Sequence, residues 1–333
     1  MTSAESADRL SVGLDVGGTK VLGVLVDVEG HVLHSVRLPT RKGCHGVVES
    51  AAGAVERLLE GAGIPLAALT LVGMGVPGVV DPLTGEVEQA VNLGIDGSIA
   101  LGSLLSARLA GVPVRADNDL NAAALGAAHL LGAQDAAGLG VTDLAFLALG
   151  TGVAAGLVLD GVVRRGHRGA AGEIGHIPFV AGGLACPCGQ RGCLEQYASG
   201  AALDLLWPSR TGRPAPAELF EAAAAGDVKA VRIRAAFADA VAAAVRILVL
   251  TCDVERVVIG GGVSALGAPL LQAVRGTLTD QAAGSPFLRS MNLAGRVELA
   301  AAGVPVAAIG ASLLGARGLP GRTAPRGQSK VLG

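Results

Sequence analysis

Aromatic side chains are scarce in this chain of 333 residues, since Phe, Tyr and Trp together make up only 2% of it. Proteins that bind single-stranded nucleic acid commonly stack the bases on aromatic rings, so the composition argues against that class. Positive charge is not in excess either, because the formal net charge is −2 at pH 7. A chain without a basic surface does not attract a polyanion, and we expect no nucleic-acid partner.

A long apolar run and a secretory leader are also missing. The best candidate for a membrane span, residues 237–250, contains Asp239 and Arg246 and is too short to cross a bilayer. Residues 1–9 have neither the basic start nor the apolar centre that a secretory signal requires. We therefore expect a cytoplasmic protein that does not bind a membrane.

The chain has five cysteines, an odd number without regular spacing, which argues against disulfides and favours a reducing compartment. Three of them, Cys186, Cys188 and Cys193, lie close together, and His176 precedes them. One His and three Cys complete a tetrahedral zinc site and leave no position for water, which is typical of a structural zinc. The sequence therefore predicts a structural Zn²⁺ with these four ligands. The alternative is a glycine-rich loop with unlinked buried cysteines.

Hydrophobic spacing and glycine punctuation predict two α/β halves. Strands are expected at residues 10–16, 21–28, 31–38, 69–76, 112–116, 144–149, 154–159, 162–164 and 254–259. Helices are expected at residues 47–61, 99–109, 120–131, 236–250, 268–278 and 306–316. The first three strands suit an antiparallel start, and a similar order begins again near residue 143. We expect an N-terminal domain of residues 1–131 that is joined by a helix at about 304–317, a C-terminal domain of residues 132–303 with the zinc motif, and a loose tail at 318–333.

A glycine turn follows the first predicted strand. Its residues Gly17 and Gly18 let backbone N–H groups approach phosphate oxygens, while Thr19 adds a hydroxyl and Lys20 adds a positive charge. Asp15 could hold a hydrated Mg²⁺ that bridges the phosphates. These features predict a nucleotide-phosphate site, with plain turn chemistry as the alternative.

Two further glycine turns follow strands of the second half. One contains Gly150, Thr151 and Gly152, and the other contains Gly261 and Gly262. None of the three turns has the Walker pattern or the dinucleotide fingerprint. Their shared position directly after strands nevertheless favours phosphate binding over chance.

Asn118 and Asp119 lie between a predicted strand and an Ala-rich helix. Phosphoryl transfer to an alcohol needs a carboxylate within hydrogen-bond reach of the attacking hydroxyl, together with groups that fix the acceptor. A neighbouring carboxylate and amide can clasp a vicinal diol. The alternative is that one of the two residues only caps the helix.

These motifs resemble those of the ROK family of sugar kinases and sugar-responsive repressors. The matching segments are residues 15–20, 75–78, 118–121, 150–152, 173–176 and 186–195. The resemblance extends from residue 12 to about 316. It implies an α/β fold of the actin- and hexokinase-like ATPases, in which two ribonuclease-H-like domains surround an interdomain cleft, with a structural zinc site.

The resemblance also implies a role for each candidate residue. Asp119 would be the general base that takes the proton from the 6-hydroxyl of a hexose. The implied sugar ligands are Gly78, Asn92, Asn118, Glu173, His176 and Glu195. The implied cofactor-binding residues are Asp15, Gly17, Gly18, Thr19, Lys20, Gly150, Thr151, Gly152, Gly261 and Gly262. The cofactors would be ATP, Mg²⁺ and Zn²⁺. The second turn departs from the family pattern at Ala154 and Ala155, where further glycines are usual.

We therefore expect ATP-dependent phosphorylation of the 6-hydroxyl of a hexose, with glucose as the first candidate. Mannose, fructose and N-acetylated hexoses stay open, and we expect a homo-oligomer, either a dimer or a tetramer. One alternative is a sugar-responsive transcriptional regulator of the same family, although such regulators carry an N-terminal helix-turn-helix and only about ten residues precede the first strand here. Another is a sugar-binding protein that has lost catalysis.

Overall fold

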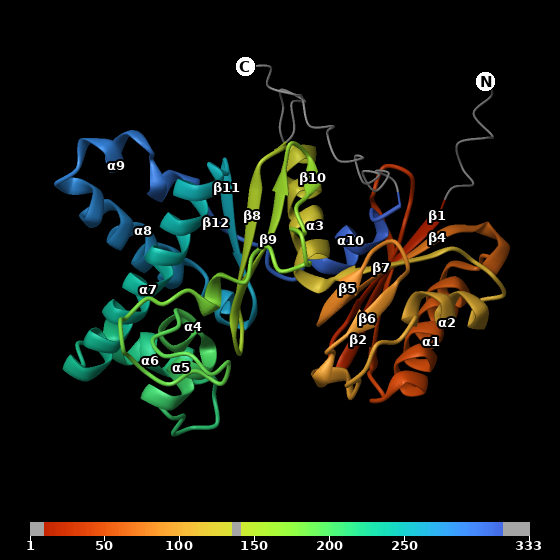
Figure 1. The fold of residues 1–333 in the computed structure, drawn as a ribbon, viewed down its shortest axis with the longest axis horizontal. Coiled ribbons are helices and arrows are strands. Elements are labelled where there is room, and N and C mark those ends of the chain that lie inside the picture. The colour runs from red at the N-terminus through yellow and green to blue at the C-terminus, as the bar shows by residue number, and fades with distance from the viewer. Residues whose placement is uncertain (1–9, 135–140, 316–333) are drawn as a thin grey trace, which may run out of the picture. The chain divides into compact units, whose positions relative to one another are not determined.

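The computed structural model describes residues 10–134 and 141–315 (Figure 1). The chain forms two compact units. Among the described residues, the first contains 10–117 and 311–315, and the second lies between Asn118 and Gly310. The predicted tail at 318–333 lies outside the described residues.

The first unit is built on a five-stranded sheet with the order β3-β2-β1-β4-β7. Its strands are β1 (Leu10–Val16), β2 (Lys20–Val26), β3 (Val32–Pro39), β4 (Leu69–Val76) and β7 (Val114–Asn118). Strands β1, β2 and β3 are antiparallel, as the sequence predicts, and β4 lies parallel to β1. The unit also contains α1 (Cys44–Ala62), α2 (Leu101–Arg108), the hairpin of β5 (Val79–Asp81) and β6 (Glu86–Glu88), and 3₁₀ turns at Leu66–Ala68 and Val91–Leu93.

Helix α1 packs on this sheet because one of its faces is apolar. Val47, Ala51, Val55 and Leu58 recur at helical spacing, and all four are buried. Each fully buried Val or Leu contributes about 1.5–3 kcal/mol relative to an exposed one. The helix ends at Gly63, whose φ of 67° is a left-handed conformation that glycine adopts without strain.

The second unit contains a sheet of the same design, with the order β10-β9-β8-β11-β12. Its strands are β8 (Leu144–Leu149), β9 (Val153–Leu159), β10 (Val162–Val163), β11 (Arg256–Gly260) and β12 (Val297–Leu299). Its helices are α3 (Asp119–Gln134), α4 (Glu195–Ala198), α5 (Gly200–Leu206), α6 (Ala215–Ala224), α7 (Val228–Cys252), α8 (Ala268–Ala283) and α9 (Pro286–Ser290). Three antiparallel strands again come first, followed by two strands parallel to β8 or β11. The order expected to begin again near residue 143 is present.

The two units divide after Asp117, whereas the domain boundary expected from the sequence follows residue 131. Helix α3 accounts for the difference, because it packs on β8 and β9 of the second sheet. A Cβ at Gly156 of β9 would overlap the carbonyl oxygen of Leu120, so the helix rests directly on the strand. The domain boundaries stay predictions.

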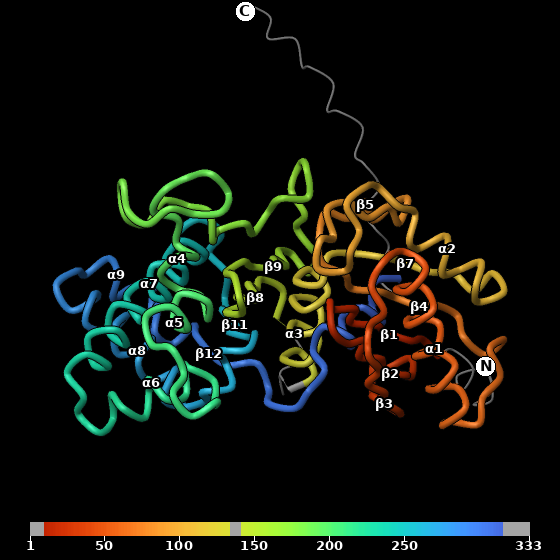
Figure 2. The backbone as a smooth tube through the Cα atoms, turned by 90° about the horizontal axis from the view of Figure 1, so that it is seen from below, coloured from red at the N-terminus to blue at the C-terminus, as the bar shows by residue number. Residues whose placement is uncertain are grey.

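Helix α7 has 25 residues and is longer than the apolar run at 237–250 indicates. The expectation that this segment is too short to span a membrane is therefore wrong. The helix begins at Val228 because the Asp227 carboxylate accepts a hydrogen bond from the Ala230 N–H at 2.9 Å. In the described part of the chain it is the one helix long and apolar enough to cross a bilayer. However, half of its most apolar window is buried, and α6 and α8 pack against it (Figure 2). A core helix has the same properties.

The backbones of α3 and the final helix, α10 (Val306–Ser312), approach each other at two glycines. A Cβ at Gly310 would overlap the carbonyl oxygen of Ala122, and a Cβ at Gly126 would overlap that of Val306. Only hydrogen fits at either position.

We predict that Gly310→Ala destabilises the protein, because overpacking of this kind costs about 1–3 kcal/mol. The matched control is Gly276→Ala in α8, where a Cβ would meet no atom within 4 Å. There the substitution stabilises by up to about 1 kcal/mol through helix propensity. Urea unfolding measures both effects, and a Gly310→Ala variant as stable as the parent would contradict the predicted overlap.

Candidate functional site

The glycine turn between β1 and β2 is held in a fixed shape by β3 and the residue after it. The Gly17 N–H donates to the Lys20 carbonyl at 2.9 Å, which closes the turn. Thr40 then binds the turn twice, since its hydroxyl donates to the Gly17 carbonyl at 2.7 Å and its N–H donates to that of Thr19 at 3.1 Å. The side chains of Thr19 and Lys20 are exposed, so both can reach a ligand.

The same turn lies against Asn92, one of the expected sugar ligands. A Cβ at Gly18 would lie 2.7 Å from the Asn92 carbonyl oxygen, and Asn92 itself is exposed.

Asp15 pairs with Gly75 in the register of β1 and β4. Gly78 follows β4 with a φ of +104°, a conformation that favours glycine. Within the first unit, the structure therefore brings Gly18 and Asn92 together.

Asn118 caps helix α3. Its Oδ1 accepts hydrogen bonds from the N–H groups of Leu120 at 2.9 Å and Asn121 at 3.4 Å. The capping alternative thus describes Asn118, while the Asp119 carboxylate accepts from the adjacent Leu120 N–H, through Oδ1 at 2.9 Å.

Asp119 has a raised pKa. Burial of the half-buried carboxylate is the main cause, and the negative charge of Glu173 raises the pKa further. The backbone N–H groups of Asp119 and Leu120 act in the opposite direction but do not cancel the effect. A carboxylate with a raised pKa binds a proton more readily than an ordinary aspartate, which a general base needs.

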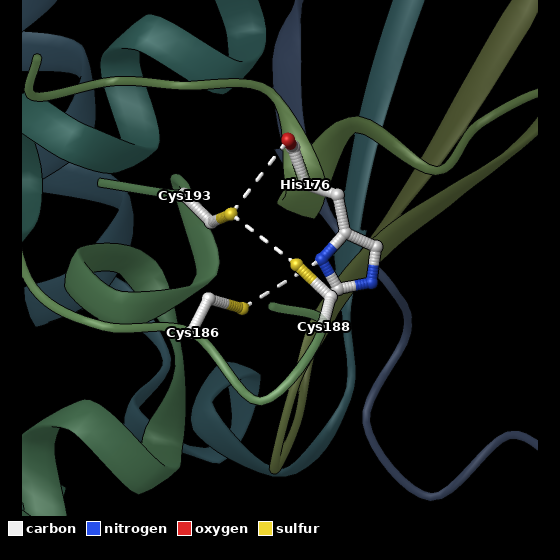
Figure 3. Close-up of side chains that lie close together, drawn as sticks. All are labelled: His176, Cys186, Cys188 and Cys193. Carbon is white, nitrogen blue, oxygen red and sulfur yellow. Dashed lines mark hydrogen bonds between the residues drawn. The ribbon is translucent and has the colours of Figure 1, made fainter. Parts of the chain in front are cut away.

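The four predicted zinc ligands gather at one point (Figure 3). Their ligand atoms all lie within 4.8 Å of one another. The Cys188 and Cys193 sulfurs are 3.7 Å apart, and the Cys186 sulfur lies 3.9 Å from Nδ1 of His176. Two sulfurs bound tetrahedrally at the usual Zn–S distance of about 2.3 Å are separated by about 3.8 Å. The donor set and its spacing therefore fit a zinc ion.

Two glycines shape the loop that carries the thiols. Gly189 has a φ of +92° and closes a turn by donating its N–H to the Cys186 carbonyl at 2.9 Å. Gly192 has a φ of +79°, and a Cβ there would overlap the Val180 carbonyl oxygen. The chain can therefore return to Cys193 only with glycine at this position.

The protonation of the thiols differs within the cluster. Burial raises the pKa of the Cys193 thiol to about 12. Hydrogen bonds from the Gln190 backbone and from Cys186 lower the pKa of the Cys188 thiol to about 7. Zinc binds thiolates, so a proton must leave Cys193 when the metal binds.

Glu195 lies against the second glycine turn. Its Oε2 accepts a hydrogen bond from the Val153 N–H at 3.0 Å, and a Cβ at Gly152 would overlap that oxygen. Gly150 N–H donates to the Gly152 carbonyl at 3.0 Å, and Thr151 is exposed at the tip. This contact could not be predicted from sequence, because Glu195 and Val153 are 42 positions apart.

The third glycine turn follows β11 and packs against the end of β8, where the second glycine turn begins. Gly261 has a φ of +84°, and a Cβ there would lie 2.5 Å from the Leu149 carbonyl oxygen. Gly262 is exposed and begins a 3₁₀ turn, Gly262–Leu266. The structure therefore groups both turns of the second unit.

The departures at Ala154 and Ala155 do not lie on the turn itself. The Ala155 side chain is part of the hydrophobic core, and its N–H donates to the Gly172 carbonyl at 2.8 Å. Ala154 pairs with Ala148 inside the sheet. Neither methyl group therefore replaces a glycine of the turn at 150–152.

A cavity of about 820 Å³ opens beside the third turn, among α6, α7 and α8. Residues from these elements and from the 3₁₀ turn line it, among them Phe220, Ala265, Leu266, Pro269 and Gln272. The sequence did not predict it, because its walls come from separate helices. Its lining residues Ala265 and Leu266 belong to the 3₁₀ turn that begins at Gly262.

Comparison with known proteins identifies the class of protein first. The duplicated sheet design is that of the actin- and hexokinase-like ATPases, and the chain is similar to the ROK hexokinase from Thermus thermophilus, with a TM-score of 0.72, 35% identity and coverage of 92% of this chain and 97% of that one. The sequence matches the ROK family over residues 11–317, and the chain belongs to this family.

Two further similarities concern proteins named as glucokinases. The structure of a ROK family glucokinase from Streptomyces griseus in complex with glucose and AMPPNP has a TM-score of 0.71 and 32% identity, and the match covers 92% of this chain and 98% of that one. A glucokinase from Streptomyces coelicolor is 39% identical over 194 residues. That match spans 58% of this chain and 57% of the relative, so it covers little more than half of either.

We predict that the protein binds one zinc ion per chain and that Cys193→Ser loses it. Removal of the most buried thiol leaves an incomplete ligand set of two thiols and one imidazole. Cys252→Ser is the matched control, because Cys252 lies in α7, outside the cluster. Metal analysis of the purified variants measures the difference, and equal zinc content in the two would contradict the assignment.

Proposed function

We propose that this chain transfers the γ-phosphoryl group of ATP to the 6-hydroxyl of a hexose, with glucose as the first candidate. The observation that carries the proposal is the half-buried Asp119 carboxylate with a raised pKa, at the start of α3 and near Glu173. Membership of the ROK family and similarity to a ROK hexokinase support it.

Asp119 acts as the general base in this proposal. Its carboxylate accepts the proton of the 6-hydroxyl as the oxygen attacks the γ-phosphorus and the bond to the bridging oxygen of ADP breaks. Oδ1 is already held by the Leu120 N–H, which fixes the carboxylate and leaves Oδ2 to receive the proton.

The other hydroxyls of the sugar are held by groups around the zinc cluster. In the second unit the proposed ligands are Asn118, Glu173, His176 and Glu195. Nδ1 of His176 faces the Cys186 sulfur, so coordination there would fix the tautomer and leave Nε2 for a sugar hydroxyl. In the first unit we propose Gly78 and Asn92 as sugar contacts.

The nucleotide is held by the glycine turns. In the first unit the proposed phosphate ligands are Gly17, Gly18, Thr19 and Lys20, and Asp15 would hold a hydrated Mg²⁺, which offsets the phosphate charge when bound. In the second unit they are Gly150, Thr151 and Gly152. The cavity of about 820 Å³ that follows Gly261 and Gly262 has room for the nucleoside.

The zinc supports a reducing, cytoplasmic location, because its three thiols must stay unoxidised. We further propose a homo-oligomer without a nucleic-acid partner. The alternatives, a sugar-responsive regulator and a sugar-binding protein without catalysis, predict no turnover. A coupled ATP assay with glucose, mannose, fructose and N-acetylated hexoses separates these possibilities and identifies the sugar, and a gel shift tests for DNA binding.

We predict that Asp119→Asn lowers kcat by about 100- to 10,000-fold, the usual contribution of a general base, while the hexose still binds. Asp204→Asn is the matched control, since Asp204 is an exposed carboxylate on α5. Turnover with Mg-ATP near the parent level in Asp119→Asn would sink the proposal.

We predict that, as the pH is lowered, kcat/KM begins to fall at a pH above 3.8, which is the ordinary pKa of an aspartate. Asp119 must be deprotonated to act as a base, and its raised pKa moves the loss of activity to higher pH. A pH profile of the parent measures the position of this limb. An acidic limb at or below 3.8 would contradict the role of Asp119.

We predict that Cys188→Ser weakens hexose binding before it changes ATP binding, because the cluster positions His176 and Glu195. A displacement of about 1 Å in such groups can cost about 100-fold in rate. Calorimetric titration with hexose and with Mg-AMPPNP measures the two affinities separately. Unchanged hexose affinity in a zinc-free variant would contradict the prediction.

A further inference from the structure

The contact between Glu195 and the second glycine turn joins two parts of the site that the proposed function treats separately. Oε2 of Glu195 is bound to the Val153 N–H at 3.0 Å, whereas Oε1 points away from the turn and would lie 4.0 Å from a Cβ at Gly152. One oxygen is thus committed to the turn and the other is available for a ligand.

A second hydrogen bond links this segment to the turn five residues after Glu195. The Gly200 N–H, at the start of α5, donates to the Gly150 carbonyl at 2.7 Å. The segment 195–200 is therefore attached to the turn at both ends, by a carboxylate and by a backbone N–H. Its other neighbour is the zinc cluster, since Cys193 lies two residues before Glu195.

The segment that carries Glu173 and His176 packs on Val153, the residue directly after the turn. A Cβ at Gly175 would overlap the Val153 carbonyl oxygen and would lie 3.4 Å from Cβ of Glu195. The N–H of Val153 binds Glu195 and its carbonyl packs on Gly175, so a movement of this one residue shifts groups on both sides.

We propose that Glu195 is a positioning residue that couples hexose binding to nucleotide binding. The inference rests on the proposed function and deepens it. Phosphate oxygens that bind the turn at 150–152 would hold the Val153 N–H in place and, through its bond to Oε2, the Glu195 carboxylate, so that Oε1 stays set for the hexose. Bound hexose in turn holds Glu195 and thereby the turn, because coupling between two ligands is reciprocal.

The sharpest test changes the turn without changing the carboxylate. In Gly152→Ala the new methyl group displaces Oε2 but keeps the charge of Glu195. We expect hexose to bind about tenfold more weakly even without nucleotide, within the range of about 5- to 150-fold that is typical of coupling between sites. Gly284→Ala, at the C-terminal end of α8 where a Cβ would meet no atom within 4 Å, is the control and leaves hexose affinity within about twofold.

A double-mutant cycle assigns the effect to Glu195. If Gly152→Ala acts through the carboxylate, it adds no further loss of hexose affinity to Glu195→Ala. Calorimetry with the hexose that the parent binds most tightly measures all four Kd values. Additive effects, or an unchanged Kd in Gly152→Ala, would overturn the inference.

A second measurement uses Glu195→Ala alone and does not depend on the folding of Gly152→Ala. In the parent, saturating hexose should tighten Mg-AMPPNP binding at least about fivefold, and in Glu195→Ala this ratio should fall toward 1. A retained ratio would contradict the inference and leave the proposed function intact. A parent that binds none of the hexoses would contradict both.

Discussion

The candidate site of the second unit depends on the convergence of four ligand atoms within 4.8 Å. His176 and Cys193 belong to segments with little regular structure of their own, a 3₁₀ turn and an irregular loop. Ile174 and Leu194, next to these ligands, are buried in the hydrophobic core. A metal bound by the four ligand atoms would in addition tie the two segments together within two residues of Glu195, and it would fix the position of the proposed sugar ligands.

Glycine determines how closely the segments of this site approach one another. At Gly152, Gly175 and Gly192 a side chain would overlap an oxygen of a neighbouring segment. At Gly175 and Gly192 that oxygen belongs to the backbone, and at Gly152 it is Oε2 of Glu195. This arrangement suits a site whose hydrogen-bond donors must be in place before the substrate arrives.

Much of the fold could be predicted from sequence, because its long elements carry clear periodicity. The strands at Leu69–Val76 and Leu144–Leu149 were predicted with their observed bounds, and the grouping of His176 with Cys186, Cys188 and Cys193 was predicted as well. The short helices α4, α5, α6 and α9 were missed, since a helix such as α5 owes its start to a local cap by Ser199 rather than to a repeating pattern. The contact of Glu195 with Val153 and the cavity beside α8 could not be predicted, because each joins residues distant in sequence.

The two sheets share one strand order, and in each of them a glycine turn follows the first strand. Such repetition is what duplication and fusion of an ancestral half produce. In a fused chain each copy can change alone. By strand register, Val16 and Val21 beside one turn correspond to Leu149 and Val153 beside the other. The halves differ at the position before, where Asp15 has Ala148 as its counterpart, and in Lys20, which only the first turn carries. Two unlike turns suit a ligand with two dissimilar ends, such as the proposed ATP.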